Sequence, residues 1–575
     1  LRRRYTGVMK KKSGLYGSFL LMVSVVVSKA AGLILKIPLA NLLGGTGMGY
    51  YSGAYAVFMP LYALCAASLP PAIAQMVSES GAHGRYDKIY LTRRVCLIFF
   101  SAVSLILTAI PLLFSDFIAT RIIGNPEARL SVMFISPCIF LGTVTNVYRG
   151  YYEGLKDMAP TAVSQMADAI VKAAAGLGLA YVTSEYAHAM YSRGEPVFGK
   201  VCLNELQATN AALPYISAAA VSGTVLADLA GLLYLLARSR AKKCAEEIAV
   251  AECGADCRDK SQSAAVLRRL LLTIAPIAIA SVVSSLINTI DLSTIILMIK
   301  LSLRKHPELY ATKYASIISS GVKMSELPNF LYGSFTGLSM AVFALAPSIC
   351  SVFGKSAFAS VAENYAKSDR AAVSKEIRRA ICSCTYVAIP AGIGLSLFSM
   401  PVLQLLFKTR YAEISVAWQP LAVLALSTAF LAVSSTAYAM LQAIGRMDLP
   451  VKITTAGAVI KLALNTVLIP TNQSGLVGAA ISTDISYLVM CVWSVAVLYK
   501  LTHTKPQLMM SVAIPLFGGV VCGAGGIFVY IYLANRLSNV ISLCISVLFA
   551  VIVYILIAVL LDITTKNKVS AQIFR

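Results

Sequence analysis

Long apolar segments separated by short polar loops recur from one end of the chain to the other. A helix needs about 20 apolar residues to cross the hydrocarbon core of a bilayer. By that measure the pattern predicts fourteen spans, near residues 18–40, 50–77, 95–114, 130–148, 159–183, 208–237, 270–299, 324–350, 380–399, 414–440, 453–470, 476–499, 508–534 and 537–561. We therefore expect an all-α, polytopic membrane protein.

The composition agrees with that of an integral membrane protein. Only 13% of its 575 residues are charged, whereas soluble domains have about 25%. The formal net charge of +23 raises nucleic acid as a partner. That interpretation is disfavoured because the basic residues are dispersed among apolar spans instead of lying on one soluble face.

The distribution of Lys and Arg predicts the orientation of the spans. With the N-terminus inside, 33 of the 49 basic residues lie in inner segments, 12 in outer loops and four within spans. Both termini are therefore expected on the cytoplasmic side. The exception is the loop near 300–323, which is predicted to lie outside and yet has five basic residues: Lys300, Arg304, Lys305, Lys313 and Lys323.

The first twelve spans resemble two sets of six. Four features recur in the same order in both halves: Pro71 and Pro347, Pro137 and Pro420, Pro160 and Pro450, and Lys172 and Lys461. Because six is even, both sets enter the membrane in the same direction, which makes them parallel repeats with a substrate site expected between them.

This repeat predicts the organisation of the chain. Residues 1–237 form an N-terminal lobe, 238–265 a cytoplasmic linker and 266–500 a C-terminal lobe. Residues 501–575 supply the thirteenth and fourteenth spans and a cytoplasmic tail.

Four lysines within spans are candidates for a positively charged, substrate-binding cavity. Lys29 and Lys36 are seven residues apart, close to two helical turns, and so share a face of the first span. Lys172 and Lys461 occupy equivalent places in the two halves. Charges inside a membrane are costly and usually functional. The alternatives are that Lys36 snorkels to the interface and that Asp168 neutralises Lys172, four residues away.

Carboxylates also occur within spans, at Asp228, Asp291 and Asp484. Asp291, near the outer end of the seventh span, either binds a coupling cation (a proton or Na⁺) or pairs with a lysine. Pairing is favoured because an isolated carboxylate in apolar surroundings is costly. Asp168 has the same two interpretations.

Catalysis, a metal and a cofactor are not indicated. The four histidines lie in loops far apart in the sequence, and the three cysteines of the linker, Cys244, Cys253 and Cys257, lack zinc-ligand spacing. The predicted outer loops are too short for a catalytic domain, so the sequence predicts a protein that is not an enzyme.

Four stretches resemble the stage V sporulation protein B-like polysaccharide-transport family. They are SKAAGLILKIPLANLLGGTGMGYY (28–51), LPPAIAQMVSE (69–79), YRGYYEGLKDMAPTAVSQMADAIVK (148–172) and LYGSFTGLSMAVFALAPSI (331–349). That family is in the superfamily of multidrug extruders, oligosaccharide-lipid flippases and lipid II flippases.

The resemblance implies a bacterial cytoplasmic membrane protein in which two lobes give alternating access to a lipid-linked pyrophosphate sugar. In the lipid II flippases a cationic cavity holds the pyrophosphate. Lys29 falls where those proteins have their first cation of span one. The second cation of span one in those proteins falls on Leu35, beside Lys36. The cations that they have on spans two and eight have no match in this chain, where the nearest basic residue is Lys323.

The leading hypothesis is a flippase that exports a lipid-linked oligosaccharide or a peptidoglycan precursor, with membrane lipids around it. The alternative is a cation-coupled multidrug antiporter of the same fold. An antiporter for cations should have an acidic cavity, whereas the first span offers two lysines and no acid. Asp291 keeps that alternative open. The sequence leaves the sugar, the coupling ion, a sporulation role and the oligomeric state undetermined.

Overall fold

The computed structural model describes residues 14–82, 85–155, 157–252, 260–319, 322–471, 475–504 and 509–564. Within these ranges the chain is helical, and extended pairing is limited to an isolated bridge between Val197 and Lys200. The chain divides into two compact units, Leu1–Ser293 and Thr294–Arg575. The lobe boundaries predicted from the repeat stay a prediction.

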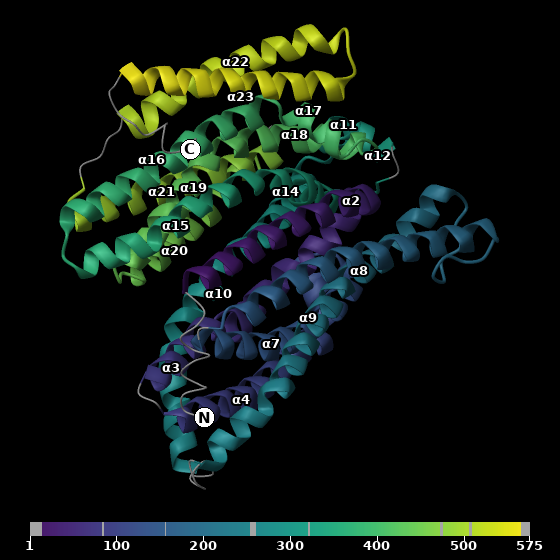
Figure 1. The fold of residues 1–575 in the computed structure, drawn as a ribbon. Helices are drawn as coiled ribbons and strands as arrows, with labels where there is room; N and C mark the ends of the chain where they lie inside the picture. The colour runs from purple at the N-terminus through teal and green to yellow at the C-terminus, as the bar shows by residue number, and fades with distance from the viewer. Residues whose placement is uncertain are drawn as a thin grey trace. The chain divides into compact units, whose positions relative to one another are not determined.

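Unit 1 is built from long helices that pack along their lengths. Its main helices are α2 (Gly14–Tyr62), α3 (Leu69–Ala82), α4 (Tyr86–Leu113), α6 (Arg129–Ile135), α7 (Pro137–Gly154), α8 (Ala159–Ser192), α9 (Glu205–Glu252) and the first part of α10 (Lys260–Lys305). Short segments link them: η1 (Ala63–Ala67), α5 (Ser115–Phe117), η2 (Ile118–Ile123) and η3 (Pro126–Ala128). Figure 1 shows α8 and α9 side by side as a long hairpin.

Unit 2 contains the end of α10 and all later helices. The short ones are α11 (Pro307–Lys313), α12 (Ala315–Ser319), α13 (Leu327–Ser334), η5 (Phe335–Ser339), α14 (Met340–Phe343), α17 (Ser399–Leu406) and η6 (Met509–Ala513). The longer ones are α15 (Leu345–Ala366), α16 (Arg370–Leu397), α18 (Tyr411–Leu426), α19 (Thr428–Ala443), α20 (Asp448–Leu468), α21 (Leu476–Thr502), α22 (Ile514–Ala534) and α23 (Asn539–Thr564).

The described residues contain 12 helices long and apolar enough to cross a membrane, or up to 13 if the bent pair α18 and α19 is one span. The all-helical polytopic fold is confirmed, but the count of fourteen is not. The difference lies in Ala30–Gly81, a single 52-residue run where the sequence predicts two spans. Gly44 interrupts this run with a φ of 61°, a conformation that glycine adopts at little cost.

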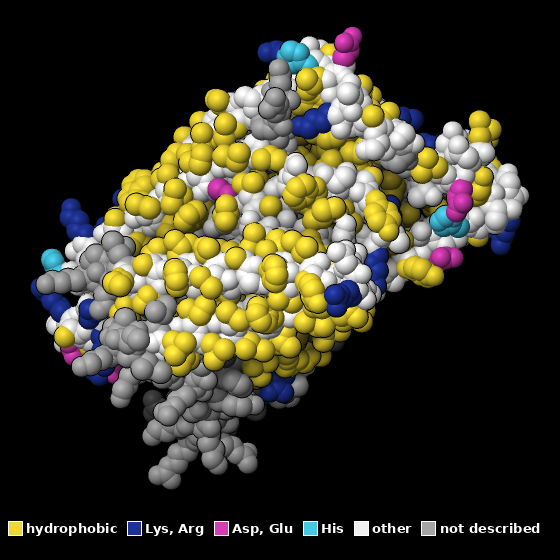
Figure 2. Space-filling view, turned by 90° about the horizontal axis from the view of Figure 1, so that it is seen from above, with side chains coloured by type: hydrophobic (Ala, Val, Ile, Leu, Met, Phe, Trp, Pro, Cys, Tyr) yellow, Lys and Arg dark blue, Asp and Glu magenta, His cyan; other side chains and the backbone are white. Residues whose placement is uncertain are grey.

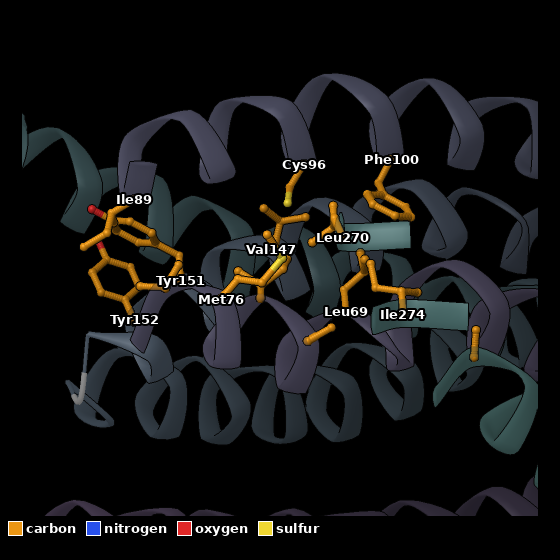
Figure 3. Close-up of a cluster of buried hydrophobic side chains, with 14 of the residues drawn as sticks. Leu69, Met76, Ile89, Cys96, Phe100, Val147, Tyr151, Tyr152, Leu270 and Ile274 are labelled. Carbon is orange, nitrogen blue, oxygen red and sulfur yellow. The ribbon is translucent and has the colours of Figure 1, made fainter. Parts of the chain in front are cut away.

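The core of unit 1 joins α3, α4, α7 and α10. Leu69, Val77, Cys96 and Leu270 are completely buried there, and Figure 3 shows Tyr151 and Tyr152 at one end of the same cluster. A small residue lets α7 approach α3 closely, because a Cβ on Gly150 would lie 2.8 Å from the Cα and the carbonyl oxygen of Pro70. Small residues at such crossings are typical of membrane helices, where close packing drives association.

In unit 2, α22 and α23 form a hairpin against α16 (Figure 1). The hydroxyl of Tyr554 on α23 donates to the carbonyl oxygen of Tyr386 on α16 at 2.8 Å. The opposite side of the hairpin exposes large apolar side chains, among them Phe517, Phe528 and Leu548. Figure 2 shows this apolar face over α22 and α23. An apolar surface of this kind fits contact with lipid chains.

Candidate functional site

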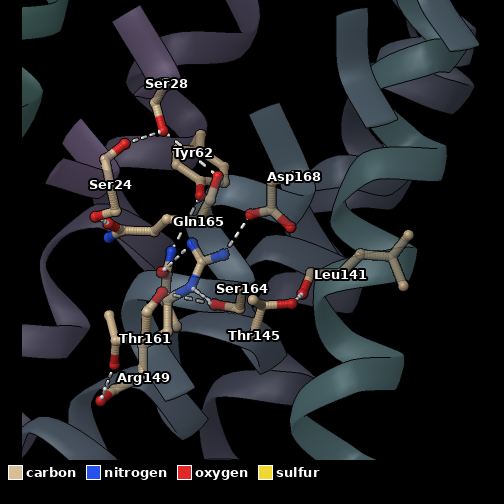
Figure 4. Close-up of polar contacts among 11 residues, drawn as sticks. Ser24, Ser28, Tyr62, Leu141, Thr145, Arg149, Thr161, Ser164, Gln165 and Asp168 are labelled. Atoms are coloured by element: carbon tan, nitrogen blue, oxygen red, sulfur yellow. Dashed lines mark hydrogen bonds and ion pairs between the residues drawn. The ribbon is translucent and has the colours of Figure 1, made fainter. Parts of the chain in front are cut away.

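A buried polar network joins α2, α7 and α8 in unit 1 (Figure 4). Its centre is Arg149 on α7, which is 8% exposed and forms an ion pair with Asp168 on α8. The Arg149 Nε donates to the Ser164 Oγ at 2.9 Å, and the Asn146 amide donates to the Tyr62 hydroxyl at 3.0 Å. Arg149 therefore joins α7 to α8, and Asn146 extends the network to α2.

Two further charges lie next to this pair. Asp228 on α9 is within electrostatic range of Asp168, Arg149 and Lys172, and its carboxylate interacts with the thiol of Cys138. The charged group of unit 1 thus contains two cations and two carboxylates. Lys172 is part of a balanced cluster, so its contribution to a positive cavity is offset by neighbouring carboxylates.

The ammonium group of Lys172 also lies over an aromatic ring. Its Nζ is 4.7 Å from the centroid of Tyr55 on α2, and the Tyr55 hydroxyl is hydrogen-bonded to that of Thr224 on α9. A cation over a ring face is stabilised by the quadrupole of the ring, more strongly when it is desolvated. These contacts hold Lys172 between α2 and α9.

The predicted cations of α2 are only partly described. The helix passes through Lys29, but the side chain of Lys29 lies outside the described residues. The preceding Ser28 is at the interface with α8, where its hydroxyl approaches the carbonyl oxygen of Gln165 at 3.4 Å. Lys36 is partly buried. Leu35, where the resemblance places a second cation, is 2% exposed and contacts the α8 backbone near Gly176.

Asp291 is 6% exposed on α10, at the end of unit 1. The nearby hydroxyl of Thr289 donates to the carbonyl oxygen of Ala56 on α2 at 2.6 Å. This hydrogen bond joins α10 to α2 two residues before Asp291. The roles of Asp291 in ion coupling or pairing stay predictions.

Unit 2 has a second buried polar group, around Lys461 on α20. Lys461 is 2% exposed and lies within electrostatic range of Asp484 on α21. One turn further along α20, the Asn465 amide donates to the Thr294 hydroxyl at 2.9 Å and accepts a hydrogen bond from Ser482. Because so little of Lys461 is exposed, contact with a substrate would require this part of unit 2 to open.

The two units therefore share an arrangement that the sequence indicates only in part. In each, a lysine on one helix lies within electrostatic range of an aspartate on the next: Lys172 and Asp228 on α8 and α9, and Lys461 and Asp484 on α20 and α21. The prolines and lysines that recur in sequence point to this equivalence. The aspartates are visible in the sequence as acids within spans, but only the structure shows which charges they face.

Arg149 is the functional candidate that the sequence analysis missed. It lies in the segment that the topology assigns to the cytoplasmic side, so it was counted with the loop residues. Its position three residues after Asn146 on the polar face of α7 is the local signal. Among the described residues, no group of three His, Cys, Asp or Glu side chains could hold a metal ion.

The fold is that of multi-pass membrane transporters. A solved structure of the lipid II flippase MurJ in an inward closed conformation is similar with a TM-score of 0.64, covering 96% of this chain and 100% of that one at 14% identity. An inward-facing multidrug resistance transporter of the MATE family is similar with a TM-score of 0.56, covering 86% of this chain and 100% of that one at 15% identity. At such low sequence identity, these similarities show a shared fold.

Sequence comparisons define the relationship more closely. Residues 15–193 match the family described as "Polysaccharide biosynthesis protein", and residues 330–549 match the family "Lipid II flippase MurJ". Stage V sporulation protein B of Bacillus subtilis is 27% identical over 32% of this chain, a stretch that spans only 39% of that relative. The lipid II flippase MurJ of the same organism is 19% identical over 82% of this chain and 80% of its own length.

The chain is a relative of the polysaccharide-biosynthesis and lipid II flippase proteins, as its sequence motifs predict. It is a multi-pass membrane protein, with 12 or more apolar helices in its described residues. The resemblance is thereby confirmed, whereas the orientation of the termini stays a prediction.

Proposed function

We propose that this protein is a flippase that exports a lipid-linked pyrophosphate sugar, an oligosaccharide or a peptidoglycan precursor, across the cytoplasmic membrane. The observation that supports it most is the relationship to lipid II flippases over 82% of the chain, combined with a first span whose ionisable residues are Lys29 and Lys36. A first span that offers cations and no carboxylate suits an anionic cargo.

The proposed mechanism is alternating access by the two lobes. The head group enters from the cytoplasmic side while the polyprenyl tail stays in lipid. The lysine ammonium groups replace water around the phosphates and act as point charges, without the fork geometry of arginine. Rocking of the lobes then releases the head group outside. An inside-negative potential favours export of an anion by about 2.3 kcal/mol per charge per 100 mV.

The second candidate is a cation-coupled multidrug antiporter. It is favoured by the fold shared with the MATE family transporter and by the carboxylates Asp228 and Asp484 within the units. Both carboxylates lie within electrostatic range of lysines, however. Carboxylates near a cation are weaker attractants for an organic cation than isolated ones.

Native mass spectrometry of the purified protein with a lipid-linked pyrophosphate sugar tests the proposal. We expect retention of the lipid, and a loss of affinity of about tenfold or more in a Lys29→Ala/Lys36→Ala variant. The control is Lys375→Ala/Lys500→Ala, which removes two cations that are exposed in unit 2.

Each outcome selects one interpretation. Binding that is lost only in the first variant supports a flippase with a head-group site on the first span. Unchanged binding in both variants keeps the flippase but rejects these lysines. Retention of organic cations with no retention of the lipid rejects the flippase in favour of the antiporter.

A further inference from the structure

The basic loop that violates the positive-inside rule forms an ordered element of unit 2. Arg304 and Lys305 lie in the last turn of α10, and Lys313 ends α11. Between residues 300 and 313 the chain has four cationic side chains and one carboxylate, Glu308. A concentration of cations on the side where they are normally depleted calls for an explanation.

The helix dipole accounts for part of this charge. Cations in the last turn of a helix interact favourably with its C-terminal carbonyl groups, which suits Arg304 and Lys305. It does not account for Lys300, which is partly buried one turn earlier and is within electrostatic range of Arg304. Two like charges four residues apart repel each other on a helix, and together they add to the positive potential at this end of α10.

Buried aromatic residues fix the segment that follows. Tyr310 is 4% exposed, Tyr314 6% and Ile317 1%, so one face of α11 and α12 is anchored in unit 2. The ring centroids of the two tyrosines are 5.7 Å apart. Lys313 lies on the same side of α11 as these tyrosines, with its Nζ 5.6 Å from the centroid of the Tyr314 ring, and it remains exposed.

Lys313 lies beside the start of α21. Its Nζ is 4.0 Å from the Cβ position of Gly475, the residue before α21, and partial burial lowers its pKa. The hydroxyl of Ser302 approaches the carbonyl oxygen of Pro470 at 3.4 Å, so the end of α10 contacts the same connection between α20 and α21. These contacts bring the cations of α10 and α11 to one end of unit 2.

Exposed apolar side chains flank the cations. Leu301 is 41% exposed and Leu309 40%. Apolar side chains next to lysines and arginines are typical of elements that lie at the level of lipid head groups. A ligand of this surface should therefore combine a negatively charged head with an apolar tail.

We propose that Lys300, Arg304, Lys305 and Lys313, the outer basic cluster, bind the pyrophosphate of the lipid-linked cargo on the side to which it is delivered. The inference rests on the proposed function and on the predicted orientation. Pyrophosphate is favoured over a bulk phospholipid because of charge complementarity. Four cations against one carboxylate suit a head with more than one negative charge, whereas phosphatidylglycerol has a single one.

Photocrosslinking in proteoliposomes tests this site. A photoreactive benzoylphenylalanine replaces Leu309, and the probe is a fluorescent polyprenyl pyrophosphate. The test variant is Arg304→Gln/Lys305→Gln/Lys313→Gln. The control is Lys323→Gln/Lys408→Gln/Arg536→Gln, which removes the same charge from loops predicted to lie on the same side.

We expect the probe to crosslink to the protein, and the test variant to reduce the crosslink by about tenfold or more while the control retains it. Unlabelled polyprenyl pyrophosphate should abolish the signal, and an excess of phosphatidylglycerol should leave it. The proposal is overturned by equal competition from phosphatidylglycerol, by an unchanged crosslink in the test variant, or by no crosslink at all.

Movement of the same probe between leaflets, measured in the same vesicles, separates this proposal from the proposed function. If the wild-type protein moves the lipid and the test variant crosslinks normally, only the outer basic cluster is rejected. If the wild-type protein crosslinks the probe in a charge-dependent way but does not move it, the site stands and the flippase function is rejected.

Discussion

Replacing Arg149 by methionine keeps most of the side-chain volume and removes the cation that faces Asp168. Ser164 and Asn146 keep other partners, since Ser164 still donates to the carbonyl oxygen of Thr161 at 3.1 Å and Asn146 to Tyr62 at 3.0 Å. The loss therefore comes mainly from a buried carboxylate without its counter-ion. Breaking a buried ion pair in this way costs about 3–5 kcal/mol.

A compensating variant sharpens this prediction. In Arg149→Met/Asp168→Leu both charges are absent, and replacing a buried pair by apolar side chains is often nearly neutral. The leucine side chain would occupy the space of the Asp168 carboxylate, which packs against Gly231 on α9. We expect the double variant to recover most of the stability that Arg149→Met loses.

Thermal unfolding in detergent, followed by the exposure of buried cysteines to a fluorogenic maleimide, measures the effect. For large domains, each kcal/mol of lost stability lowers Tm by about 2 °C or more. Arg149→Met should therefore lower Tm by about 6–10 °C. The reasoning is refuted if Asp168→Leu and Arg149→Met have additive effects, because independent contributions would mean that the pair is not coupled.

Three further predictions follow from the packing. Gly150→Ala should lower Tm because its Cβ would meet the Pro70 backbone at 2.8 Å. Gly178→Ala, which has nothing within 4 Å of its Cβ position, should leave Tm unchanged or raise it. Equal effects of the two substitutions would contradict the close crossing of α3 and α7. Lys461→Met should destabilise more than Lys461→Met/Asp484→Leu, and the reverse order of Tm would exclude pairing. Tyr554→Phe should cost about 1 kcal/mol through the lost bond to α16, measured against Tyr530→Phe as a control.

The apolar pattern predicts most of the helices because each span must bury its own backbone hydrogen bonds in lipid. The pattern is less informative about where one helical run ends. The predicted spans 18–40 and 50–77 leave the glycine-rich stretch around Gly44 as a loop, whereas the structure continues the helix on both sides of a single non-helical residue. Local propensity alone does not distinguish a loop from a break of this kind.

For the candidate site, the sequence identifies charged residues within spans but does not identify their partners. Intramembrane lysines are conspicuous in the sequence because charge is rare there, so Lys172 and Lys461 could be identified. Their partners depend on which helices become neighbours, and that is decided by packing. Asp168 lies four residues from Lys172, a spacing that predicts a pair along one helix, yet its ion pair is with Arg149 on α7.

The helix α10 has a mechanical consequence. It continues across the boundary between the units after Ser293, and residues 277–306 contain neither glycine nor proline, the usual sites of a bend. The helix should therefore be stiff up to its end at Arg304 and Lys305, where Ser302 contacts the connection between α20 and α21. A ligand held at that tip more tightly in one state than in the other would shift the equilibrium between them. Under the proposed function, release of the cargo would itself favour the return to the starting state.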